Sequence, residues 1–252
     1  YDNPVLDTED KIKQAVASFT GTLREQKVFN KWVIAEGKVF DKIPTIKSME
    51  GLVIREIGIG VDYGSVNPTT FVPVAICFRQ SDRRWVLVRL KCYYHDSKKE
   101  NDNPTTEFYS FQLKMFILYL KDQYPNIPIT DLVIDSEASH FDNRLTVDNI
   151  EHSLSRKGEG SVDTGVQHLQ SLFYKEVMYV LDTPSIRYFL PDGHYQEDTV
   201  DRGLLELEGY QYDRIRSAKM GTNCYKKELD HTIDAQRYII RMFVDTGRCP
   251  VV

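Results

Sequence analysis

The chain has 252 residues, of which 41% are hydrophobic and 27% are charged, an ordinary composition for a soluble globular protein. The formal net charge of −5 argues against a protein held on nucleic acid by bulk positive charge, although it allows an enzyme with an acidic metal cluster and a local basic groove. No apolar run approaches the roughly 20 residues that span a bilayer, and the four cysteines, scattered without a CxxC pair, argue against a zinc site and fit a reducing, cytosolic compartment.

The first 48 residues differ from the rest of the chain. They combine a predicted helix, from about Thr8 to Leu23, with the irregular segment VFNKWVIAEGKVFDKIP. We interpret residues 1–48 as the end of a preceding domain and its linker, because they are too short to fold alone, and residues 49–252 as the main domain. The sequence does not begin with methionine, so we expect it to be part of a longer polypeptide.

Three strands are predicted at the start of the main domain. Residues 52–62, 70–79 and 84–92 are rich in Val, Ile, Phe and Trp, and the turn-like stretches GSVNP and QSDRR separate them. Connections this short favour antiparallel neighbours, so we expect a meander of three strands.

A helix and a buried strand are predicted next. The helix begins near Thr105 after Pro104, with a Thr or an Asn as its cap, and runs to about Gln123, with apolar residues at helical spacing between them. Residues 131–135, DLVID, follow two prolines and are typical of a parallel strand that is buried on both faces.

The remaining chain alternates helices with a strand. We expect helices at residues 141–155, 162–174, 183–190, 200–207 and 227–244, and a strand at residues 177–181. The whole order predicts an α/β fold with a mixed sheet, three antiparallel strands followed by parallel strands, flanked by helices on both faces. A ribonuclease H-like fold has this order of elements.

Asp62 ends the first predicted strand, in IGIGVDYG. The glycines at positions 58 and 60 leave one face of that strand small, so that a neighbour or a ligand can approach closely. The alternative interpretation is an aspartate that caps a turn at the end of a strand.

Asp135 ends the strand DLVID, and open α/β sheets bind their ligands at the carboxyl ends of such strands. Glu137 would lie on the same side as Asp135 if the strand continued that far. The alternative interpretation of Asp135 is an N-cap of the following helix.

Asp234 lies on the last predicted helix, at the border of its apolar stripe, and shares a face with His231 one turn earlier. Asp230 competes with Asp234 for the same role, and we prefer Asp234 because it is aligned with the stripe. The alternative interpretation is an ion pair between Asp234 and Arg237.

Three aspartates that emerge from one core indicate a metal site, because a buried carboxylate is costly without a partner. Asp62, Asp135 and Asp234 are the predicted ligands, with Asp230 and Glu137 as further candidates. Hard oxygen ligands without thiolates select Mg²⁺ or Mn²⁺, and phosphodiester hydrolysis uses two such ions about 4 Å apart. His231 is a candidate ligand or proton carrier.

Several segments, in order, resemble the large subunit of the terminase, the DNA-packaging motor of tailed bacteriophages. YDNPVL and FNKWVIAEGKVFD resemble the end of its ATPase domain and the linker to its nuclease domain. IGIGVDYGSVNPTTFVPVAI, LVIDSEASHF, and DRGLLELEGYQYDR followed by ELDHTIDAQRY resemble its three nuclease motifs. The resemblance places Asp62, Asp135, His231 and Asp234 at the catalytic positions.

The resemblance implies a ribonuclease H-like endonuclease that cuts concatemeric viral DNA during packaging, with little sequence preference. It implies double-stranded DNA, an upstream ATPase domain, the small terminase subunit and the portal of the capsid as partners, no membrane, and the cytoplasm of the infected bacterial host as location. No GxxxxGK[ST] loop occurs in the sequence, so we expect no motor activity from it.

Two segments depart from the family pattern. SLSRKGEGSVDTG is polar and glycine-rich where the family has a short strand with a lysine, and SIRYFLPDGHYQED is longer than expected, which suggests a hairpin or an insertion near the site.

Basic residues in two places are candidates for contacts with DNA phosphates, which need only charge and reach. Arg156 and Lys157 lie in the glycine-rich loop, and a second group precedes the third motif: Arg214, Arg216, Lys219, Lys226 and Lys227. A solvated surface loop is the alternative interpretation for each of them.

Other functions fit parts of the pattern. A Holliday-junction resolvase or integrase is the nearest alternative within nucleases, and the linker-like WVIAEG segment favours terminase. A sugar-kinase or actin-like ATPase also has Asp-x-Gly after its first strand, but it needs a second glycine-rich phosphate loop. In a non-enzymatic assembly module the carboxylates would be structural.

Overall fold

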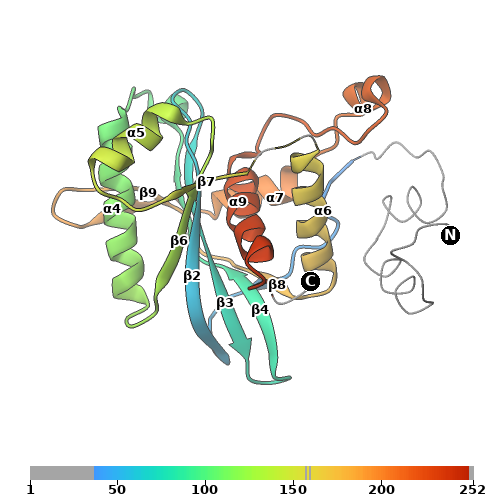
Figure 1. Cartoon of the computed structure of the whole chain (residues 1–252), viewed down its shortest axis with the longest axis horizontal. Coiled ribbons are helices and arrows are strands. Elements are labelled where there is room, and N and C mark those ends of the chain that lie inside the picture. Colours follow the sequence, from blue (N-terminus) through green and yellow to red (C-terminus); the bar gives the residue numbers. More distant parts are fainter. Residues whose placement is uncertain (1–36, 157, 159, 250–252) are drawn as a thin grey trace.

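The computed structural model describes residues 37–249 apart from residues 157 and 159. The helix expected from Thr8 to Leu23 and most of the predicted linker lie outside the described residues. Within them, one mixed sheet runs through the molecule and helices cover both of its faces (Figure 1).

The predicted antiparallel meander is confirmed. It consists of β2 (Leu52–Asp62), β3 (Thr69–Arg79) and β4 (Arg84–Arg89), and β3 pairs antiparallel with both of its neighbours. These strands are rich in β-branched and aromatic residues, which favour an extended backbone packed on both faces.

Parallel strands extend the meander on both sides. On one side, β6 (Ile129–Ile134) pairs with β2, and β7 (Ser153–Leu154) pairs with β6. On the other side, β8 (Met178–Leu181) pairs with β4, and β1 (Thr45–Ile46) pairs with β8. The order β1-β8-β4-β3-β2-β6-β7 confirms the predicted ribonuclease H-like mixed sheet.

Two helices cover one face of the sheet (Figure 1). They are α4 (Thr106–Gln123), whose cap is the Thr105 side chain out of the Thr or Asn expected, and α5 (Ser139–Val147). The second half of the helix predicted at residues 141–155 is wrong. The chain leaves the helix after Val147, passes through Asn149 with a φ of 53°, and then forms β7 instead.

The other face carries α6 (Ser161–Tyr174), α7 (Arg202–Gly209) and α9 (His231–Asp245) (Figure 1). These agree with the predicted helices within a few residues. The short helices α3 (Ser97–Glu100) and α8 (Arg214–Met220) were not predicted.

The helix predicted at residues 183–190 is also wrong. Residues there form β9 (Ile186–Phe189), which pairs with β10 (Tyr195–Glu197) and with β5 (Tyr93–His95). The hairpin that the unusual length of SIRYFLPDGHYQED suggested is therefore present.

The two faces of β2 differ in a way that positions α9. Ile59 and Val61 pack into the core under α4 and α5. On the opposite face, a Cβ atom at Gly60 would lie 1.8 Å from the backbone oxygen of Ala235, and one at Gly58 would lie 2.4 Å from Ile239 Cδ1. Only glycine lets α9 approach β2 this closely, which is the close neighbour that the sequence predicted.

The residues just before β1 belong to the packed structure. Val39 and Phe40 are buried in the same core as α6 and α9. The domain boundary at residues 48 and 49 stays a prediction. In the described part of the chain, no helix is long and apolar enough to cross a membrane.

Candidate metal centre

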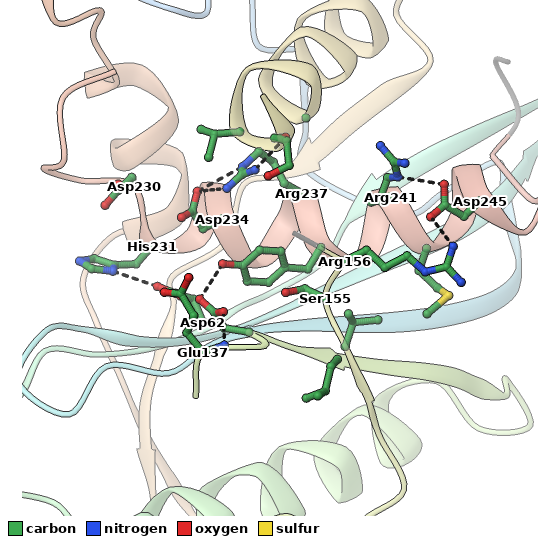
Figure 2. A pocket seen from close by; sticks show the side chains of 18 of the residues that line it. Asp62, Glu137, Ser155, Arg156, Asp230, His231, Asp234, Arg237, Arg241 and Asp245 are labelled. Atoms are coloured by element: carbon green, nitrogen blue, oxygen red, sulfur yellow. Dashed lines mark hydrogen bonds and ion pairs between the residues drawn. The ribbon is translucent and has the colours of Figure 1, made fainter. Parts of the chain in front are cut away.

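A pocket of about 550 Å³ lies where β2, β6 and α9 meet (Figure 2). In Figure 2, His231, Asp230 and Asp234 lie at one end of it and Arg241 and Asp245 at the other. The acidic and histidine side chains among its lining residues are Asp62, Asp135, Glu137, Asp230, His231, Asp234 and Asp245.

Strand geometry places the first two aspartates. Val61 of β2 pairs with Ile134 of β6 in parallel register, so Asp62 and Asp135 follow paired residues at the same edge of the sheet. Side chains alternate along a strand, and Asp62 therefore lies on the face of Gly58 and Gly60, toward α9. The third aspartate, Asp234, comes from the first turn of that helix.

His231 is the partner of Asp62. Its Nδ1 atom lies 3.0 Å from Asp62 Oδ2, and the two side chains are 19% and 15% exposed. The hydroxyl of Thr70 on β3 donates to the backbone oxygen of His231 at 3.2 Å, which fixes the same helical turn to the sheet.

Arg237 is the partner of Asp234, as the alternative interpretation of that pair expected. The Arg237 side chain is 7% exposed, and the two bonds from its guanidinium to this carboxylate, at 2.6 and 3.1 Å, both go to Oδ1. A third bond, at 3.4 Å, runs to the backbone oxygen of Ser161 on α6. Because both bonds to Asp234 use the same carboxylate oxygen, Asp234 can pair with Arg237 and still line the pocket.

Tyr238 is a partner of Asp135. Its hydroxyl donates to Asp135 Oδ2 at 3.0 Å, and the backbone N–H of Glu137 donates to Oδ1 at 2.8 Å. The strand β6 ends at Ile134, so Glu137 reaches the pocket from a turn and not by strand alternation. One helix, α9, thus contributes a partner to each of the three aspartates.

The charges in the pocket are only partly balanced. Burial raises the pKa of Asp62 from 3.8 to about 6; the His231 hydrogen bond opposes this, and the charges of Asp234 and Asp135 add to it. Burial and the charge of Asp234 also raise the pKa of Asp230. Burial would lower the pKa of His231, but the hydrogen bond to Asp62 and the charge of Glu206 raise it above its usual value. A site whose carboxylates resist ionisation in this way is suited to a cation.

The chemistry of the donors fits Mg²⁺ or Mn²⁺, because carboxylate oxygens from several elements line the pocket and no thiol does so among the described residues. In their present rotamers, no three acidic, histidine or cysteine side chains in the described part of the chain are arranged to hold one ion. Each aspartate is bonded to a protein donor, and the bonds from Arg237 use only one oxygen of Asp234.

The predicted DNA-binding residues fall into three groups. Arg156 and Lys227 line the pocket. The residues that do not line it are Arg214, Arg216, Lys219 and Lys226. Lys157 lies outside the described residues.

Tyr238 and Arg241 are among the pocket residues that were not proposed from the sequence. Tyr238 lies one helical turn after Asp234, so its spacing was a usable signal. Arg241 lies a further turn along the same face and pairs with Asp245, which also contacts Arg156 at 3.6 Å.

No protein-family model matches the chain, and no curated protein sequence does. Solved structures do. The chain is similar to a structure of the large terminase from a thermophilic bacteriophage, with a TM-score of 0.71 and 20% identity over 96% of this chain and 53% of that one. A complex of the same terminase with ADP gives a TM-score of 0.70 and 21% identity over 96% of this chain and 54% of that one.

A weaker similarity is to the large terminase nuclease from the thermophilic phage G20c with bound magnesium, with a TM-score of 0.47 and 14% identity over 81% of this chain and 96% of that one. Similarity at that level carries no argument about this chain. The match to the first of these large terminases shows a shared fold, and this chain spans about half the length of that protein.

Proposed function

We propose that this chain is an Mg²⁺- or Mn²⁺-dependent endodeoxyribonuclease that cuts concatemeric viral DNA during genome packaging, with little sequence specificity. The observation that carries the proposal is the gathering of Asp62, Asp135 and Asp234, from three separate elements, around one pocket with unbalanced negative charge. The fold shared with half of a bacteriophage large terminase supports the biological setting.

The carboxylates hold the ions in this proposal. Asp62, Asp135 and Asp234 supply the main oxygen ligands, and Asp230 and Glu137, which line the same pocket, are further candidates. Two divalent cations, when bound, activate a water molecule and stabilise the leaving oxygen of the phosphodiester.

The partners on α9 orient these carboxylates. Arg237 holds one oxygen of Asp234 and leaves the other to the pocket, and Tyr238 holds Asp135 through its hydroxyl. His231, bonded to Asp62, has a ring that can carry a proton to or from the attacking water or the leaving oxygen.

The substrate in this proposal is double-stranded DNA. Arg156, which is 82% exposed, and Lys227 line the pocket and supply positive charge for contacts with DNA phosphates. By its resemblance to the terminase family, the chain would work with an upstream ATPase domain, the small terminase subunit and the portal, in the cytoplasm of the infected bacterium.

A plasmid-nicking assay tests the proposal. The wild-type protein is expected to nick supercoiled DNA in Mg²⁺ or Mn²⁺ and not in EDTA, and Asp135→Ala is expected to abolish nicking while its circular dichroism spectrum stays unchanged. The matched control is Asp131→Asn, on the same strand but paired with Arg248 away from the pocket, which should nick like the wild type.

Retained nicking by Asp135→Ala would reject the metal assignment. Nucleotide binding without DNA cleavage by the wild type would favour the kinase-like alternative instead.

A further inference from the structure

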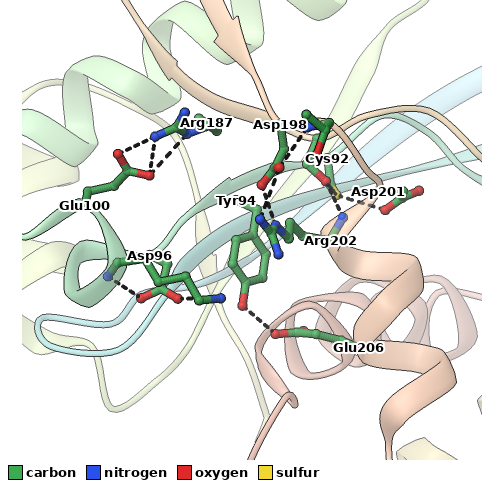
Figure 3. A network of polar contacts seen from close by, with 12 residues as sticks. Cys92, Tyr94, Asp96, Glu100, Arg187, Asp198, Asp201, Arg202 and Glu206 are labelled. Carbon is green, nitrogen blue, oxygen red and sulfur yellow. Dashed lines mark hydrogen bonds and ion pairs between the residues drawn. The ribbon is translucent and has the colours of Figure 1, made fainter.

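Glu206 on α7 is a buried carboxylate that contacts the start of α9. It is 2% exposed. Its Oε2 atom accepts from the backbone N–H of Thr232 at 2.7 Å and from the hydroxyl of the same threonine. Its Oε1 atom accepts from the hydroxyl of Tyr94 at 2.9 Å, a contact visible in Figure 3. Glu206 therefore joins α7, β5 and the first turn of α9.

The first turn of α9 needs such a partner. The first N–H groups of a helix have no acceptor within the helix and are usually satisfied by the N-cap side chain. Asp230 occupies the N-cap position of α9 but makes no side-chain capping bond. Glu206 takes over this role from another element, and its negative charge is favourable at the positive end of the helix dipole.

The position is costly for a carboxylate. Burial raises the pKa of Glu206, and the bonds from Thr232 oppose that rise. The contacts described for Glu206 are with hydroxyl groups and one backbone amide, not with an ion-pair partner. This carboxylate is costly to bury, and it accepts two hydrogen bonds at the start of α9 and a third from β5, so its role exceeds the filling of core volume.

The turn that Glu206 holds carries the site. His231 immediately precedes Thr232, and Asp234 follows it by two residues. His231 lies 3.0 Å from Asp62, and the charges of Asp234 and Glu206 act on Asp62 and His231 respectively. A small shift of this turn would move His231 and Asp234 together relative to β2.

We propose that Glu206 is a positioning residue of the candidate site, which caps α9 from α7 and so holds His231 and Asp234 in place against Asp62. The expected effect of Glu206 on DNA cleavage rests on the nuclease function proposed above. Its expected effects on the position of the first turn of α9 and on cation binding do not.

The test compares Glu206→Ala with Glu206→Gln. In the glutamine variant the amide oxygen can accept both bonds from Thr232 and the NH₂ group can donate to the Tyr94 hydroxyl, so the geometry is kept and the charge is lost. Thr105→Ala is the matched control, because it removes a helix cap from α4 on the opposite face of the sheet.

Three quantities are measured on the whole chain: amide hydrogen exchange in the first turn of α9, Mn²⁺ affinity by calorimetry, and kcat and KM for DNA cleavage. Glu206→Ala is expected to speed exchange in that turn about tenfold and to weaken Mn²⁺ binding by about 10- to 100-fold, the usual effect of losing a group that orients metal ligands. The expected kcat falls by a similar factor with KM for DNA unchanged.

Glu206→Gln should stay within about threefold of the wild type in all three quantities, and Thr105→Ala should leave them unchanged. Wild-type Mn²⁺ affinity and kcat in Glu206→Ala would overturn the proposal, and so would equal losses in Glu206→Ala and Thr105→Ala.

The test separates this proposal from the proposed function. If the wild type cleaves no DNA, the nuclease function fails, and hydrogen exchange and Mn²⁺ affinity still judge the role of Glu206. If Glu206→Ala does not fold, the isosteric variant Thr232→Val replaces it in the test, because it removes one of the three bonds to Glu206. It should weaken Mn²⁺ binding severalfold, and an unchanged affinity would overturn the proposal.

Discussion

Replacing Asp62 by asparagine should stabilise the metal-free protein at neutral pH. The fold raises the pKa of this carboxyl from 3.8 to about 6, so the folded state favours the protonated form. The preference of the folded state for the protonated carboxyl stabilises the fold fully below about pH 4. This stabilisation is lost as the pH rises through about 6. Asparagine keeps the size of the side chain and an acceptor for His231 but never acquires the charge.

The magnitude follows from the shift. A rise of about two in pKa corresponds to about 3 kcal/mol, which is an upper figure because Asp62, Asp135, Asp234 and His231 titrate together. Above pH 6.5 in EDTA, Asp62→Asn should therefore be more stable than the wild type by up to about 3 kcal/mol, or several degrees in Tm for a domain of this size. Near pH 4 the two proteins should be equally stable.

Urea denaturation from pH 4 to pH 8 in EDTA, followed by tryptophan fluorescence, measures the difference. Asp122→Asn, a change on the exposed surface of α4, is the control and should match the wild type at every pH. In Mn²⁺ the order should reverse, because ions that bind the folded wild type stabilise it and the variant has lost a ligand. A variant that is no more stable than the wild type at pH 7.5, or whose advantage is independent of pH, would refute the reasoning.

Three further predictions concern residues around the pocket and in the core. Tyr238→Phe removes the hydroxyl that holds Asp135, so Mn²⁺ affinity measured by calorimetry should fall about tenfold while the far-ultraviolet spectrum stays the same; an unchanged affinity would show that the bond is dispensable. Gly60→Ala puts a Cβ atom 1.8 Å from the backbone of α9, so the helix must move and both Mn²⁺ binding and Tm should drop, and a wild-type Tm would contradict the packing described for β2. Asp201→Ala leaves the fully buried Arg89 without its ion-pair partner and removes the N-cap of α7, which should lower the free energy of unfolding in urea by about 3–5 kcal/mol; a loss below about 1 kcal/mol would argue against a buried ion pair.

The central sheet and the long helices were predictable because their signals are local. The strand that ends at Asp62 alternates glycine with isoleucine and valine, and the structure uses this alternation as expected, with α9 on the glycine face. Asp62 and Asp135 were likewise expected at one edge of the sheet, because each follows an apolar run and the two runs form paired strands.

The wrong secondary-structure predictions concern segments whose conformation depends on pairing with strands that are distant in the sequence. The sequence SIRYFL is short enough to suit a helix or a strand, and its partners in β5 lie about 90 residues away in the chain. Residues 153 and 154 form a strand only because β6 offers its free edge, and two residues carry no periodicity.

The acidic residues of the candidate site were predictable from the sequence, but among their partners only Arg237 was. Spacing on one helix could indicate that Asp234 and Arg237 pair, but it could not show that Arg237 uses one oxygen alone. Glu206 and Thr232 lie on two different helices and are 26 positions apart in the sequence, so no local pattern reveals their contact.

The most direct test of the central claim, that aspartates from β2, β6 and α9 bind divalent cations together, is a crystal structure of the chain soaked in Mn²⁺ and measured at the manganese absorption edge. We predict anomalous peaks within roughly 2.3 Å of carboxylate oxygens of Asp62, Asp135 and Asp234. Peaks confined to other parts of the surface, with none beside these three carboxylates, would contradict it.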